Sequence, residues 1–198
     1  MSLGEAEVSG ELYRVIRCKW SLSILSHLAH EPMSFTQIAR LLNISNKVLA
    51  EKLRRLSRLS LIQYNGAGLY SLSPEGYNLV ETVEPLLHRG VEPMHLSEVL
   101  KCKWMAETLI MLLRGGMHPS EIRRSLAGLS WKVLSQRLGK LLRMGFVRRE
   151  IIPSKPVRVR YSLTSTGRHT AYWLLTSVRE GLDPAQTGMW GLLPKSRL

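Results

Sequence analysis

A segment in the second half of the chain carries polar side chains at a spacing suited to reading nucleic-acid bases. From Ser130 onward leucines recur at helical intervals, which gives a predicted helix one apolar face and one polar face. A lysine on the polar face can donate to guanine O6 and N7, and a glutamine can pair with adenine N6 and N7. The predicted DNA-facing residues of this segment are Ser130, Trp131, Lys132, Ser135 and Gln136.

Two of these residues have a second interpretation. Ser130 is either a nucleic-acid contact or a plain helix N-cap, and we favour the cap, which is worth about 1 kcal/mol. A cap would still direct the positive end of the helix at a phosphate. Trp131 either packs against a sugar–phosphate edge or covers the core, and the sequence does not decide between the two.

A similar segment in the first half offers a weaker set of contacts. Its predicted DNA-facing residues are Asn46, Lys47 and Arg54, with Asn46 as a reader of adenine. The same helix carries a run of bases made up of Lys52, Arg54, Arg55 and Arg58. Such a run is either a solvated helix face or part of a binding surface, and both interpretations stay open.

A third group of basic residues surrounds a predicted hairpin. Val157, Val159 and Tyr161 alternate with two arginines, so those arginines share one face of a strand. A basic ribbon of this kind suits contact with the DNA backbone or the minor groove. The predicted contacts are Arg148, Arg149, Lys155, Arg158 and Arg160, with Glu150 as the only acid among them. The matching hairpin of the first half has no charged residue from position 63 to position 73.

The overall charge also favours a polyanionic partner. The 198 residues include 28 Lys and Arg against 15 Asp and Glu, a formal net charge of +13. Residues 1–90 carry 10 bases and 8 acids, whereas residues 91–198 carry 18 bases and 7 acids. General solubility is the alternative explanation for a basic protein, but it gives no reason for this asymmetry. We therefore expect double-stranded DNA as the partner and the second half as the main binding module.

No pattern in the sequence is typical of a catalytic, cofactor or metal site. There is no Ser–His–Asp order, glycine-rich phosphate loop or paired-carboxylate motif, so we expect neither an enzyme nor a cofactor. The six histidines lack ligand spacing, and no zinc site is expected. Cys18 and Cys102 each precede a Lys–Trp pair. We expect core tryptophans and buried, inert thiols there, with a redox switch as the alternative.

The expected location is cytoplasmic. No stretch approaches 18 uninterrupted apolar residues, so no transmembrane helix and no membrane partner are expected. The first ten residues have no basic side chain and no long apolar run, which argues against a secretory signal. Two cysteines do not make a disulfide scaffold, and a reducing compartment is the simple interpretation.

Three short motifs occur twice in the same order. They are Cys-Lys-Trp at 18–20 and 102–104, Ser-x-Lys-Val-Leu at 45–49 and 130–134, and Tyr-Ser-Leu-x-x-x-Gly at 70–76 and 161–167. The offset between copies is 84 or 85 for the first two motifs and 91 for the third. The chain therefore contains two copies of one module, which differ mainly in the segment before the tyrosine.

Each copy predicts three helices, a two-stranded hairpin and a last helix. In the first copy these are helix 11–29, which can break near Cys18, helix 35–42, a helix capped by Ser45, strands 61–64 and 69–72, and helix 77–87. In the second copy they are helices 96–113, 119–126 and 130–144, strands 146–151 and 157–163, and helix 167–180. The predicted fold is mainly α with small β-hairpins, as two tandem winged helix-turn-helix domains.

The repeated motifs resemble the HxlR-type regulators, a branch of the MarR-like winged-helix proteins. The resemblance rests on Lys-Trp in the first helix, Ser-x-Lys-x-Leu at the start of the third, and Tyr-Ser-Leu-Thr-x-x-Gly after the wing, and it covers residues 11–88 and 95–180. It implies transcriptional regulators that bind DNA as homodimers, with the first and last helices forming the contact between subunits. This chain departs from the family in having two modules and a short first wing. It also has no cysteine upstream of Cys18 or Cys102 at the place of the family's sensor cysteine.

These observations predict three parts: a first domain over 1–90, a second domain with a long basic wing over 91–181, and a tail over 182–198. The expected function is a sequence-specific DNA-binding transcriptional regulator that acts as a fused pseudo-dimer, with a homodimer of whole chains left open. The alternative is a tandem winged-helix adaptor that binds proteins within a nucleic-acid-associated complex. The neutral first wing and the nearly neutral first half favour that alternative.

Overall fold

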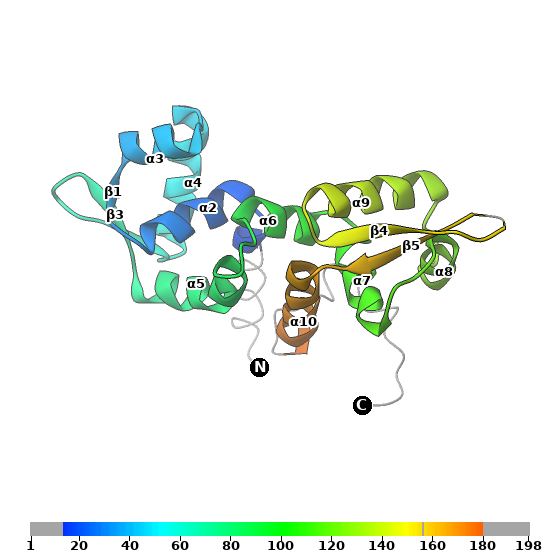
Figure 1. Ribbon diagram of the computed structural model, residues 1–198. Helices are drawn as coiled ribbons and strands as arrows, with labels where there is room; N and C mark the ends of the chain where they lie inside the picture. Colours follow the sequence, from blue (N-terminus) through cyan, green and yellow to red (C-terminus); the bar gives the residue numbers. More distant parts are fainter. Residues whose placement is uncertain (1–13, 156, 180–198) are drawn as a thin grey trace. The chain divides into compact units, whose positions relative to one another are not determined.

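The computed structural model describes residues 14–155 and 157–179, which divide into two compact units (Figure 1). We call residues 14–101 the first unit and the described residues from 102 to 179 the second unit. Each unit is mostly helical with a small antiparallel sheet, so the predicted tandem architecture is confirmed. The predicted tail over 182–198 and the last residue of the predicted helix 167–180 lie outside the described residues.

The first unit is built around one central helix. Its elements are α2 (Lys19–Leu28), β1 (Met33–Ser34), α3 (Phe35–Leu42), α4 (Asn46–Arg58), β2 (Ile62–Tyr64), β3 (Leu69–Leu72), α5 (Pro74–Leu87) and α6 (Pro93–Lys101). Helix α2 packs against α3, α4, α5 and α6. Its side chains Leu22, Ile24 and Leu25 are fully buried. Burial of this apolar surface drives the packing of the other helices around α2.

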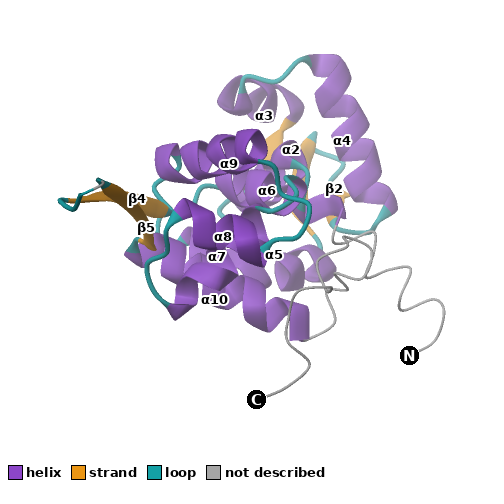
Figure 2. Cartoon of the chain, turned by 90° about the vertical axis from the view of Figure 1, so that its right-hand side faces the viewer, coloured by secondary structure: helices purple, strands orange, loops and turns teal. Residues whose placement is uncertain are grey.

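The second unit repeats this order of elements. They are α7 (Met105–Met111), a single 3₁₀ turn (Leu112–Arg114), α8 (Pro119–Ser125), α9 (Trp131–Arg143), β4 (Val147–Ile152), β5 (Arg158–Leu163) and α10 (Ser165–Arg179). Helix α7 packs against α9 and α10, and α8 packs against α9 and β5. Figure 2 shows the hairpin of β4 and β5 projecting beyond the helices of its own unit.

The two helices before each hairpin form a helix-turn-helix. The turn between α3 and α4 contains Asn43 at φ 47°, and the matching turn between α8 and α9 contains Gly128 at φ 82°. Both residue types tolerate this left-handed conformation, which reverses the chain in a few residues. The predicted inner faces of the second helices are confirmed, since Leu49, Leu53, Leu56, Leu134, Leu138 and Leu141 are all buried.

The sheets contain one strand that the sequence did not predict. In the first unit β1 joins the hairpin to give the antiparallel order β1-β3-β2, with Met33 opposite Tyr70. In the second unit an isolated bridge joins Met117 to Tyr161 in the same way. Two residues are too few to produce a recognisable alternation of apolar and polar side chains.

The predicted helix 96–113 is wrong. The chain forms α6 and α7 instead, because Trp104 adopts a left-handed conformation at φ 75° and ends helical continuity. Helix α6 packs against α2, and the first unit extends to Lys101. The break expected near Cys18 is confirmed, since Cys18 is extended and α2 begins at Lys19. Residues 11–13 of that predicted helix lie outside the described residues.

A glycine allows the helix after each hairpin to lie close to the backbone just before the hairpin's first strand. A Cβ on Gly76 would lie 2.1 Å from the Leu61 carbonyl oxygen, and one on Gly167 would lie 1.8 Å from that of Phe146. The helices begin two or three residues earlier than predicted, because Ser73 Oγ accepts from the N–H of Gly76 and Thr164 Oγ1 accepts from that of Gly167, each at 3.0 Å.

Candidate nucleic-acid interface

The first two turns of α9 present the polar side chains that the sequence predicts to face DNA. Lys132, Ser135 and Gln136 are exposed on the face opposite the buried leucines. Ser130 Oγ accepts from the N–H of Val133 at 3.3 Å, so Ser130 is the N-cap of the helix, as favoured from sequence. The N-terminal turn of the second helix is the part that enters the major groove in helix-turn-helix proteins.

Trp131 does not cover the core. Its side chain is 52% exposed, and the guanidinium of Arg123, on α8, lies over the ring at 5.0 Å from its centroid. This is a cation–π contact, in which the positive group is attracted to the negative face of the ring. Sequence analysis missed Arg123. Two adjacent arginines in the helix before the turn were the available signal, because the first helix of this motif crosses the DNA backbone.

An open groove lies between the start of α8, the start of α9 and β5. It is lined by His118, Pro119, Ser120, Glu121, Arg124, Trp131, Arg158 and Val159. His118 Nδ1 lies 2.6 Å from the carbonyl oxygen of Val159, at hydrogen-bond distance. That contact joins the helix-turn-helix to the wing, so both sides of the groove belong to one packed unit.

The second wing divides into two faces with different charge. The register pairs Ile152 with Arg158 and Glu150 with Arg160, so these side chains share one face, and the predicted common face of Arg158 and Arg160 is confirmed. Arg148 is on this face too, but its Nε lies 2.9 Å from Glu150 Oε1.

The remaining wing bases are also exposed. Arg149 is opposite Tyr161 on the other face of the hairpin, and Lys155 lies in the connection between the strands. Among the described residues, neither Arg158 nor Arg160 has an ion-pair partner in the structure. The net positive charge of the arginine-bearing face therefore comes from Arg158 and Arg160, since Arg148 and Glu150 neutralise each other.

The first unit presents fewer charges at the corresponding places. Asn46, Lys47 and Arg54 are exposed on α4. The basic run of that helix is interrupted, because Lys52 Nζ lies 2.9 Å from Glu51 Oε1. The hydrogen bond and the charge of Lys52 lower the pKa of Glu51, which keeps this carboxylate ionised.

The first wing is neutral and aromatic. The rings of Tyr64 and Tyr70 pack with their centroids 5.0 Å apart, and Tyr64 is 61% exposed. No charged residue occurs in this hairpin, so it offers no counter-charge to phosphates.

The two cysteines differ from their predicted setting. Neither thiol is buried, and the neighbouring Trp20 and Trp104 are partly exposed, with Lys19 and Lys103 over their rings at 4.3 and 4.6 Å. Each is a cation–π contact, in which the lysine ammonium lies over the face of a ring that the core was expected to cover.

The surroundings of Cys18 change its acidity. Partial burial by itself would raise the pKa of the Cys18 thiol, but the polar groups of the neighbouring Ser21 and the charge of Lys52 outweigh it, and the pKa lies below the usual value. The Cys102 sulfur lies 3.8 Å from Lys140 Nζ.

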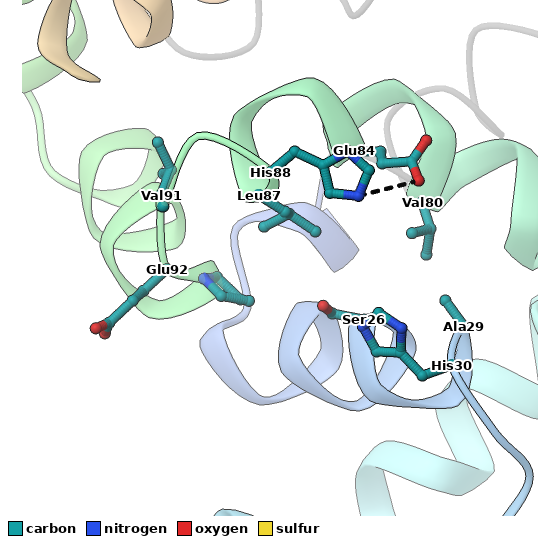
Figure 3. A pocket seen from close by; sticks show the side chains of 11 residues that line it. Ser26, Ala29, His30, Val80, Glu84, Leu87, His88, Val91 and Glu92 are labelled. Atoms are coloured by element: carbon teal, nitrogen blue, oxygen red, sulfur yellow. Dashed lines mark ion pairs between the residues drawn. The ribbon is translucent and has the colours of Figure 1, made fainter. Parts of the chain in front are cut away.

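A separate pocket in the first unit lies outside the helix-turn-helix (Figure 3). It opens between the end of α2, the second half of α5 and the loop before α6, and its polar groups include Ser26, His30, Glu84, His88 and Glu92. Glu84 Oε1 lies 3.6 Å from His88 Nε2 across one turn of α5, as the dashed line in Figure 3 shows.

Two kinds of feature are absent from the part of the chain that the structure describes. Across 14–155 and 157–179, no three histidine, cysteine or acidic side chains gather in a way that would hold a metal ion. In the same part of the chain, no helix is both long enough and apolar enough to span a membrane.

Comparison with known proteins identifies the same module twice. The model of the HxlR-like helix-turn-helix family matches residues 15–96 and again residues 99–178. The HTH-type transcriptional regulator YvaP of Bacillus subtilis is 43% identical over 74 residues, which make up 37% of this chain and 68% of YvaP. YvaP is therefore little more than half as long as this chain.

Two further proteins are similar. The HTH-type transcriptional regulator sll1512 of Synechocystis is 34% identical over 89 residues, which are 45% of this chain and 66% of that protein. A solved structure described as a MarR-family transcriptional regulator from Enterococcus faecalis V583 has 23% identity and a TM-score of 0.41, over 59% of this chain and 93% of that one.

Proposed function

Because the chain belongs to the HxlR-like helix-turn-helix family, we propose that it is a transcriptional regulator that binds double-stranded DNA at specific sequences. The observation that carries the proposal is the exposed polar face of the first two turns of α9, beside a hairpin whose arginines share one face. In this arrangement the helix reads base edges in the major groove while the hairpin neutralises phosphates.

Each reading helix has its own set of base contacts. In the second unit Lys132 donates to guanine and Gln136 pairs with adenine, while Ser130 caps the helix. In the first unit Asn46 reads adenine, with Lys47 and Arg54 beside it on α4. The second unit supplies most of the affinity, because its wing is basic and the first wing is neutral.

The two units act together as a pseudo-dimer within one chain. Both carry a helix, a helix-turn-helix, a hairpin and a following helix in the same order, and the relative YvaP, with little more than half the length, has room for one such module. The two halves of one chain therefore take two half-sites on DNA, with or without pairing of whole chains. Such a protein works in the cytoplasm alongside the chromosome, and the proposal assigns it no catalytic step.

The test is a fluorescence anisotropy titration of labelled duplex DNA at several salt concentrations. If about five to six basic side chains contact phosphates, log K falls against log salt with a slope of about −5. A selection from random-sequence duplexes then enriches a preferred sequence. Absence of binding at low salt, or a slope near zero, would overturn the proposal and leave the protein-binding adaptor as the explanation.

A further inference from the structure

The groove between α8 and β5 is lined by one arginine from each of these two elements. Arg124 comes from the helix-turn-helix and Arg158 from the wing, and both are exposed. Two arginines that line one groove are suited to a phosphate, because each guanidinium can donate two parallel hydrogen bonds to its oxygens.

The groove is held open by contacts that do not use either arginine. His118 Nδ1 meets the Val159 carbonyl oxygen at 2.6 Å, which fixes the start of α8 against β5. Trp131 forms a wall, and Arg123 lies over its ring at 5.0 Å. A site whose walls are already packed avoids most of the ordering cost of binding.

The one carboxylate in the groove is already engaged. Glu121 Oε2 accepts from the backbone N–H of His118 at 2.6 Å, at the start of α8. The two guanidinium charges exceed this single negative charge, so the groove favours an anion.

The first unit lacks half of this arrangement. Arg40 occupies the position of Arg124 in the repeat, at an offset of 84 residues, but the first hairpin has no base to place opposite it. The paired arginines are therefore a feature of the second unit, and Arg40 provides a matched control.

We infer that this groove binds one phosphate of the DNA backbone, gripped between Arg124 and Arg158. The inference rests on the proposed function, since Trp131 begins the reading helix and the groove therefore adjoins the DNA that the helix enters. The phosphate clamp couples the wing to the helix-turn-helix and sets the register of α9 on the duplex, because backbone contacts position a protein on DNA.

The experiment uses the full chain and the duplex enriched by selection. Each backbone phosphate is replaced in turn by a neutral methylphosphonate, and affinity is measured for the wild type, R124A, R158A, the double variant R124A/R158A and the control R40A. At one position, neutralisation weakens the wild type and R40A about tenfold but leaves the double variant unchanged. The effects of R124A and R158A are less than additive, because both grip the same phosphate.

Three results would overturn the clamp while leaving DNA binding intact. The first is that every phosphate responds equally in the wild type and the double variant. The second is that R124A and R158A are additive. The third is that inorganic phosphate raises the melting temperature of the wild type but not of the double variant, with no phosphate of the duplex distinguished, which would identify a free-anion site. Failure of the wild type to bind any duplex would instead refute the proposed function.

Discussion

The charge on one face of the second wing provides a direct test of how this protein holds DNA. Two double variants remove two side chains each from the same face of the hairpin. R158A/R160A removes two positive charges, whereas R148A/E150A removes an arginine and its partner carboxylate, whose Nε and Oε1 lie 2.9 Å apart. Both variants truncate two side chains on the same face of the hairpin, but only R158A/R160A changes the net charge of that face.

The expected size follows from the number of phosphates released. Each phosphate contact contributes about 0.9 to the slope of log K against log salt. Loss of Arg158 and Arg160 therefore flattens the slope by up to about 1.8. Between about 50 and about 200 mM salt, the wild type then loses about tenfold more affinity than R158A/R160A does. R148A/E150A keeps the wild-type slope, because the pair it removes is neutral.

The assay is the anisotropy titration on one duplex over that salt range, with thermal melting to verify that both variants fold. The reasoning is refuted if R158A/R160A keeps the wild-type slope. It is equally refuted if R148A/E150A flattens the slope as much, since bulk rather than charge would then explain the effect.

Three further predictions concern stability and reactivity. Gly167→Ala lowers the free energy of unfolding by about 3 kcal/mol in urea titrations, because the new Cβ overlaps the Phe146 carbonyl. Gly139→Ala in α9 instead raises the free energy of unfolding by about 0.5–1 kcal/mol, because alanine favours a helix more than glycine does. Equal effects of the two variants would contradict this. Burial raises the pKa of Glu107, so its ionised form destabilises the folded state. Glu107→Gln therefore raises the free energy of unfolding at pH 7, and this increase vanishes below about pH 4, where Glu107 is protonated in both states. An increase that persists at low pH would exclude this cause. In a C102S variant, alkylation of Cys18 proceeds at lower pH than alkylation of a free cysteine peptide, and an identical pH profile would show that its pKa is not lowered.

The framework of both units could be predicted from sequence because it depends on local signals. Leucines at helical spacing, the serine cap at Ser130, and the glycines of the first hairpin turn each act within a few residues. Because the motifs are repeated, the same succession of helices and hairpin is predicted twice from independent stretches of sequence, which made the helix-turn-helix and hairpin order recognisable in both copies.

The errors arose where distant contacts decide the conformation. The Cys-Lys-Trp motif interrupts the helix in both copies, but the break was expected only near Cys18, and no local signal indicates that α6 packs on α2. The sequence placed Arg148 among the wing contacts without its Glu150 partner, because pairing depends on strand register. Arg123 was missed for the same reason, since its contact with Trp131 crosses the turn between two helices.

The two reading helices begin differently, with Asn46 and Lys47 in one unit and Trp131 and Lys132 in the other. A dimer of identical subunits selects a palindrome, and a palindrome looks the same from either end. A single chain with two unlike halves selects a site that has a direction. With the pseudo-dimer proposed above, the protein lies on DNA in one orientation only, and inverting the site turns the second unit toward the opposite flank.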